Sequence, residues 1–140
     1  MALVLGTTSC KKEEPQSNTP THLGVWELTS VREVYFTNNK SSSEEISYFD
    51  PTEDAMERLH FKDASNGDMI IVYPNNEEPQ ETYPFTYKIE GSKLTISDSD
   101  GDYVFEELNI QAQTLTLGIY EEGSTNNPDR LLIYLNYKRI

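Results

Sequence analysis

The sequence predicts an all-β fold in which eight antiparallel strands run up and down and close into a barrel. From residue 23 onward, apolar side chains recur mostly at every second position, which is the period of a half-buried strand. Short turns containing Gly, Asn and Asp separate these runs. Nine tyrosines enrich the chain in the aromatic residues that strands favour. Closure into a barrel would leave no strand edge unpaired.

The first strand is expected at Gly24–Phe36. A strand of this length usually bends or bulges to serve both sides of a barrel. Residues 42–49 show no clear pattern. A short helix is expected around residues 51–57, because Asp50 can cap it and Pro51 suits its first turn. This helix would cover one end of the barrel.

The seven later strands are shorter and alternate more clearly. Asn66-Gly67 is a strong hairpin dipeptide and predicts a tight turn. Acidic loops are expected at 75–81 and 121–129. The later strands are expected at Arg58–Lys62, Met69–Tyr73, Thr82–Ile89, Lys93–Ser97, Tyr103–Ile110, Thr114–Tyr120 and Leu131–Arg139.

Composition and charge exclude several classes of function. The formal net charge of −13 leaves no basic stripe that could neutralise phosphates, so nucleic acid is not an expected partner. The two histidines, His22 and His60, have no cysteine or second histidine at ligand spacing. The acidic segment Asp98–Asp102 is interpreted as a hairpin turn, because its spacing fits a calcium loop poorly. We therefore expect no metal, no cofactor, no enzymatic activity and a monomeric protein.

The N-terminal residues are typical of an exported, lipid-anchored protein. A short apolar run within Met1–Ser9 is followed by small residues and by Cys10, the only cysteine. The stretch LGTTSC resembles the lipobox of Bacteroidetes lipoproteins, and the following KKEE resembles the export signal of their surface-exposed members. This resemblance implies lipidation of Cys10, which would anchor the chain in the bilayer of the bacterial outer membrane, facing the surface or the periplasm. The expected divisions are a signal-peptide remnant at 1–9, whose true start lies upstream, a flexible tether at 10–22 and one domain at 23–140.

The domain itself resembles a known family. Gly24-Val25-Trp26 resembles the Gly-x-Trp signature of lipocalins, and 23–140 as a whole looks like the lipocalin-like domain of Bacteroidetes lipoproteins, with the stretches GVWELTSV, YKIEGSKLTI and YLNYKRI. The resemblance implies that Trp26 closes one end of the barrel against an arginine of the last strand. Arg139 fits that role independently, because in an eight-stranded meander the first strand starts where the last one ends.

An excess of aromatic residues leaves two functions open. In the first, the barrel binds a small hydrophobic ligand. In the second, the barrel is filled and presents its acidic loops to a protein or glycan partner. An eight-stranded interior is just wide enough for side chains or for one small ligand. The aromatic side chains that would line such a ligand are Phe61, Tyr83, Phe85, Tyr87, Tyr103 and Phe105.

Overall fold

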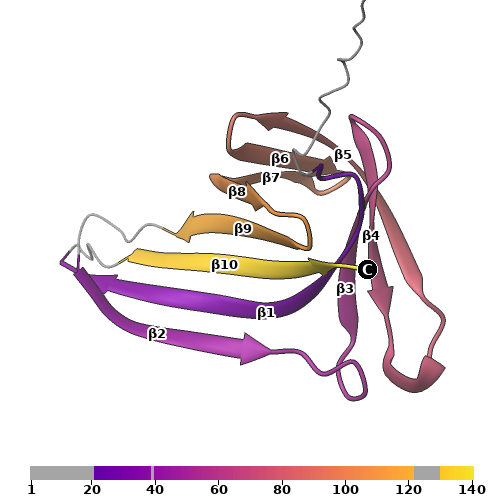
Figure 1. Ribbon diagram of the computed structural model, residues 1–140, viewed down its shortest axis with the longest axis horizontal. Coiled ribbons are helices and arrows are strands. Elements are labelled where there is room, and N and C mark those ends of the chain that lie inside the picture. Colours follow the sequence, from indigo (N-terminus) through magenta and orange to yellow (C-terminus); the bar gives the residue numbers. More distant parts are fainter. Residues whose placement is uncertain (1–20, 39, 122–129) are drawn as a thin grey trace, which may run out of the picture.

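The computed structural model describes residues 21–38, 40–121 and 130–140. These residues form ten β-strands and one short 3₁₀ helix at Pro74–Asn76 (Figure 1). The strands are β1 Gly24–Thr37, β2 Lys40–Tyr48, β3 Met56–Phe61, β4 Asn66–Val72, β5 Glu81–Glu90, β6 Lys93–Asp98, β7 Gly101–Phe105, β8 Glu107–Ile110, β9 Thr114–Glu121 and β10 Arg130–Arg139.

All strands belong to one antiparallel sheet with the order β7-β6-β5-β4-β3-β1-β10-β9-β8, and β2 pairs with β1 beside this path. Neighbours in the sheet are therefore mostly neighbours in the chain, and the first strand pairs with the last. This arrangement confirms the predicted all-β, up-and-down antiparallel fold. In Figure 1, β1, β2, β9 and β10 extend to one side, and β3 to β6 curve around the other.

Strand β1 divides one of its edges between two partners. Residues 24–27 pair with β3, whereas residues 30–37 pair with β2. On its other edge, the register with β10 shifts between Leu28 and Ser30, so one extra residue of β1 forms a bulge. The bulge shifts the alternation by one position. Consequently Trp26 and Leu28 point into the core before the bulge, and Val31 packs against the core after it.

The structure corrects the predicted helix at 51–57. The chain makes a single turn, in which Asp50 accepts backbone hydrogen bonds from Glu53 at 3.0 Å and from Asp54 at 2.7 Å. The Asp50 carboxylate also accepts bonds from the Thr52 backbone and hydroxyl, which lower its pKa. The predicted cap is thus present, but the helix does not continue. Strand β3 already begins at Met56, which pairs with Val72 of β4.

Two further differences raise the number of strands from the predicted eight to ten. Most of the segment 42–49, for which the sequence shows no clear pattern, belongs to β2. This strand is exposed along its whole length. The predicted strand Tyr103–Ile110 is interrupted at Glu106, giving β7 and β8. These two strands lie at the two ends of the sheet order, so the hydrogen-bonded ladder is not closed. The two ends nevertheless lie next to each other, since β7 contacts β9 and β6 contacts β8.

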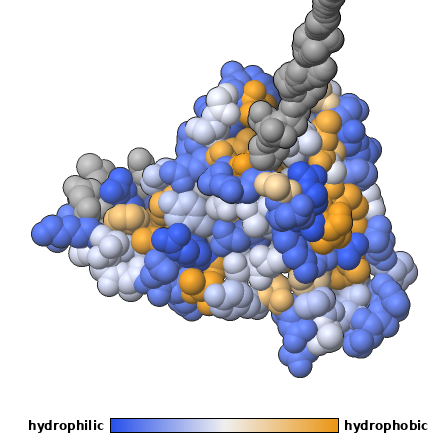
Figure 2. Space-filling model, viewed as in Figure 1, coloured by the Kyte–Doolittle hydropathy of each residue, from blue (hydrophilic) through white to orange (hydrophobic). Residues whose placement is uncertain are grey.

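The core lies inside the curved sheet and contains side chains from both of its halves. Its largest fully buried members are Trp26, Phe61, Leu94, Leu115 and Leu117. The face of the molecule shown in Figure 2 is mostly polar, with separate hydrophobic patches. In the part of the chain that is described, no helix is long and apolar enough to cross a membrane.

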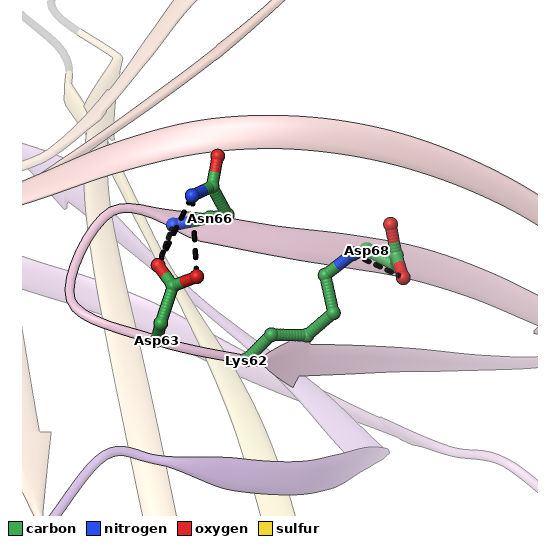
Figure 3. A network of polar contacts seen from close by, with 4 residues as sticks. All are labelled: Lys62, Asp63, Asn66 and Asp68. Atoms are coloured by element: carbon green, nitrogen blue, oxygen red, sulfur yellow. Dashed lines mark hydrogen bonds and ion pairs between the residues drawn. The ribbon is translucent and has the colours of Figure 1, made fainter.

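The turn between β3 and β4 differs from the Asn-Gly turn predicted from sequence. Asn66 and Gly67 are the first residues of β4, and the turn lies just before them (Figure 3). The Asp63 carboxylate organises this turn by accepting hydrogen bonds from the backbone nitrogens of Ser65 and Asn66 and from the Asn66 side chain. These bonds lower the pKa of Asp63. Lys62 and Asp68 add an ion pair of 3.2 Å across the hairpin.

Candidate functional site

One end of the barrel is closed by Trp26 and Arg139. Trp26 is fully buried, and its Nε1 donates a hydrogen bond of 2.7 Å to the carbonyl of His22. Trp26 and Arg139 are directly paired in the register of β1 and β10. The guanidinium carbon of Arg139 lies 4.1 Å from the centre of the Trp26 ring, which is a favourable cation–π distance. The structure therefore brings together the two residues that the sequence places at the closed end.

Arg139 also fastens the backbone around this end. Its nitrogens donate to the carbonyl oxygens of Thr21 at 2.7 Å, Leu23 at 2.8 Å and Ala112 at 3.0 Å. The close approach requires glycine at position 24, where φ is +119° and an added Cβ would lie 3.0 Å from Arg139. Arg139 thus joins the segment before β1 to the turn between β8 and β9.

His22 belongs to the folded domain, although the sequence assigns it to the tether. The Tyr87 hydroxyl donates its single proton to the carbonyl of Asp63, so the bond of 2.7 Å between His22 Nε2 and that hydroxyl must be donated by the histidine. The His22 ring also packs edge-on against Phe61. Burial lowers the pKa of His22 and raises that of Tyr87. The end of the predicted tether is therefore fixed to the core.

A pocket of about 300 Å³ lies on the side of the barrel away from this closed end, and we name it the barrel pocket. Its walls come from β3, β4, β5, β6, β7 and β10. Most of the lining is apolar, with two carboxylates and three tyrosines. The lining residues are Glu57, Leu59, Met69, Tyr83, Pro84, Phe85, Ile96, Asp98, Tyr103, Phe105, Leu135 and Tyr137.

The structure divides the six aromatic residues that the sequence singles out as a possible lining. Tyr83, Phe85, Tyr103 and Phe105 line the barrel pocket. The other two, Phe61 and Tyr87, pack against each other with ring centres 4.9 Å apart, beside His22 at the closed end. Because Phe85 contacts both of them from the pocket side, it forms the boundary between the packed end and the pocket.

Sequence reasoning misses the polar part of the pocket lining, which is formed by Glu57 and Tyr137. The buried Tyr137 hydroxyl donates a hydrogen bond of 2.6 Å to Oε2 of Glu57. Burial, and then the charge and hydrogen bond of Glu57, raise the pKa of Tyr137 well above its usual 10.0. This hydroxyl therefore stays protonated and remains a donor. The alternation of Phe61 and Leu59 places Glu57 inside as well, if the predicted strand Arg58–Lys62 is extended by one residue toward the N-terminus.

Other predicted features lie outside this site or outside the described residues. Cys10 and the tether up to residue 20 are not described, nor are residues 122–129 of the second acidic loop. The Asp98–Asp102 segment forms the turn between β6 and β7. Within residues 21–38, 40–121 and 130–140, no three His, Cys, Asp or Glu side chains are grouped closely enough to hold a metal ion.

Comparison with known proteins gives one finding. A family model described as a lipocalin-like domain matches residues 23–117, which is more than half of the chain. The match runs from the start of β1 into β9 and includes every lining residue of the barrel pocket except Leu135 and Tyr137. No curated protein and no solved structure matches the chain. Together with the fold, this match shows that the chain belongs to the family of lipocalin-like domains.

Proposed function

We propose that this protein binds a small apolar ligand in the barrel pocket. The observation that carries the proposal is a pocket of about 300 Å³ with mainly apolar walls. Small-molecule sites are commonly concave, mostly apolar and about 300–1,000 Å³ in volume. The barrel pocket is at the lower end of this range, so its ligand is small. Binding without catalysis, by a monomer, is the activity we propose.

The pocket also favours binding over the alternative of a filled barrel that only presents acidic loops. Side chains fill the closed end, where Trp26, Phe61 and Tyr87 are buried. They do not fill the other end. Residues 75–81 are exposed, as an interaction loop requires, but exposure alone names no partner.

A titration with N-phenylnaphthylamine, a neutral dye that fluoresces in apolar surroundings, tests the proposal. We expect saturable fluorescence with the wild-type protein and at least a tenfold weaker Kd for Met69→Trp, because the larger side chain occupies the pocket. Met69→Leu is the matched control, since it nearly conserves volume and should leave binding unchanged. Thermal melting of both variants verifies folding. Equal dye binding by wild type and Met69→Trp would place the dye elsewhere and contradict the proposal.

We further propose that the domain is held at the bacterial outer membrane through lipidated Cys10. The lipobox resemblance of residues 5–10 supports this anchor, and two acyl chains hold a protein firmly where one is marginal. Thr21 lies at the closed end, beside Arg139, so a tether reaching it would attach there and leave the pocket free.

Replacing the anchor residue should release the protein. With a full signal peptide supplied, we expect Cys10→Ser to move the protein from the membrane pellet to the soluble fraction, because no acyl chain can be added. Fractionation with immunoblotting measures this. The matched variant is Ser9→Ala, which keeps the cysteine and should stay in the pellet. A Cys10→Ser protein that sediments with outer membranes would contradict lipidation.

A further inference from the structure

We propose that the barrel pocket selects ligands whose apolar body ends in an ammonium group, and that Glu57 is the residue that receives this group. The inference rests on the proposed binding function and specifies the chemistry of its ligand. It follows from the charges around the pocket, from the orientation of the neighbouring cations and from the hydrogen bond of Tyr137.

The charged side chains of the pocket are all of one sign. Its charged lining residues are Glu57 in the wall formed by β3 and Asp98 at the end of β6. Among the lining residues that the structure describes, there is no lysine, arginine or histidine. A ligand carboxylate would therefore enter a site that already holds negative charge, and a ligand cation would be attracted.

The basic residues next to Glu57 and Tyr137 in the chain belong to the opposite face of the sheet. Arg58 pairs with Glu27 at 2.9 Å, and Lys138 approaches the same carboxylate at 3.9 Å. Because side chains alternate between the two faces of a strand, these cations are directed away from the pocket. Among the described residues, no ion pair involves Glu57.

Among the described residues, Tyr137 is the only one that donates a hydrogen bond to the Glu57 carboxylate. An ionised carboxylate offers about four acceptor positions, so most of its capacity is available to a ligand. Since Tyr137 keeps its proton, it fixes the carboxylate without neutralising it. Glu57 is partly buried, and a charge removed from bulk water interacts more strongly with an opposite charge than an exposed one does.

Three probes with the same alkyl chain separate head-group selection from apolar binding. These are n-octylamine, n-octanol and n-octanoate, titrated into the protein by calorimetry at neutral pH and moderate salt. We expect n-octylamine to bind about tenfold more tightly than n-octanol, which is the effect of one hydrogen bond with a charged partner. We expect n-octanoate to bind most weakly, because two carboxylates repel it.

Substitutions of single acidic residues test which carboxylate causes the preference for n-octylamine. Glu57→Gln should weaken n-octylamine binding much more than n-octanol binding, so that the roughly tenfold preference is lost. Glutamine can still accept the bond from Tyr137, so the fold should be retained, as melting will verify. Asp98→Asn, at the other charged lining residue, should weaken n-octylamine binding by less than Glu57→Gln does. Asp102→Asn removes the same unit of charge from outside the lining and should have no effect, which excludes long-range attraction by the net charge.

The possible results distinguish this inference from the function on which it rests. If all three probes bind equally, or if n-octanoate binds best, the pocket is an apolar site without cation selection and the inference is wrong. An amine preference that persists in Glu57→Gln would also overturn it. If none of the three probes binds, the proposed function fails and the inference fails with it.

Discussion

Trp26→Ala is expected to destabilise the domain by about 3–5 kcal/mol, the range for truncating a large aromatic side chain in a core. Trp26 is fully buried, and its removal leaves a cavity between the closed end of the barrel and Arg139. The substitution also removes the donor to the His22 carbonyl and leaves the guanidinium without its aromatic partner. Because the free energy of unfolding of a domain is typically only about 5–15 kcal/mol, the substitution would remove a large part of it.

Urea unfolding followed by circular dichroism measures this effect. The matched control is Tyr120→Ala, which truncates an aromatic side chain that is 42% exposed on β9 and should change the free energy of unfolding little. A Trp26→Ala protein that unfolds at the same urea concentration as wild type would show that this residue does not hold the closed end together.

Gly67→Ala is expected to destabilise the protein by about 1–3 kcal/mol, although it adds a single methyl group. Gly67 is buried at the start of β4, directly opposite Phe85 on β5. A Cβ at this position would lie 2.5 Å from Cζ of Phe85 and 2.6 Å from the carbonyl oxygen of His60. The carbonyl belongs to the backbone of β3, so moving the ring alone would not relieve this contact and the strands would have to shift as well.

Thermal melting compares Gly67→Ala with Gly118→Ala, which places the same methyl group in strand β9. There the three nearest atoms are side-chain atoms of Glu107 and Tyr134 at 3.0, 3.1 and 3.2 Å, which is less severe than the contacts at Gly67 and involves no backbone atom. We therefore expect a clearly smaller loss for Gly118→Ala. Equal melting temperatures for the two variants would mean that the Phe85 ring yields easily and that Gly67 is not required for packing.

The alternation of apolar residues predicts much of this fold because most strands have one face inside the barrel. Phe85 and Tyr87 on β5, and Leu115 and Leu117 on β9, are examples in which every second residue is buried. The same reasoning places Trp26 and Arg139 at one end, since first and last strands of a meander pair. In these strands the local pattern and the tertiary structure agree, so the sequence alone is sufficient to predict which side chains face the core.

The pattern is insufficient where tertiary structure decides the conformation. Strand β2 is exposed on both faces and carries no alternating pattern, and it forms because residues 30–37 of β1 offer it a partner edge. The bulge after Leu28 and the interruption at Glu106 each shift a strand without a distinctive residue at the site. The pocket position of Glu57 is not evident from sequence for a related reason. Asp50 and Pro51 are typical of a helix start, and the helix that they predict, at residues 51–57, includes Glu57.

The position of Trp26 also has a consequence for spectroscopy. It is the only tryptophan in the chain, it is fully buried at the closed end, and it does not line the barrel pocket. Its intrinsic emission therefore reports the integrity of the folded domain, and solvent reaches the indole only when the barrel end opens. A ligand bound in the barrel pocket would not touch the indole directly. Folding can accordingly be followed through the indole emission of a sample without dye, and binding through the emission of a dye added to a second sample.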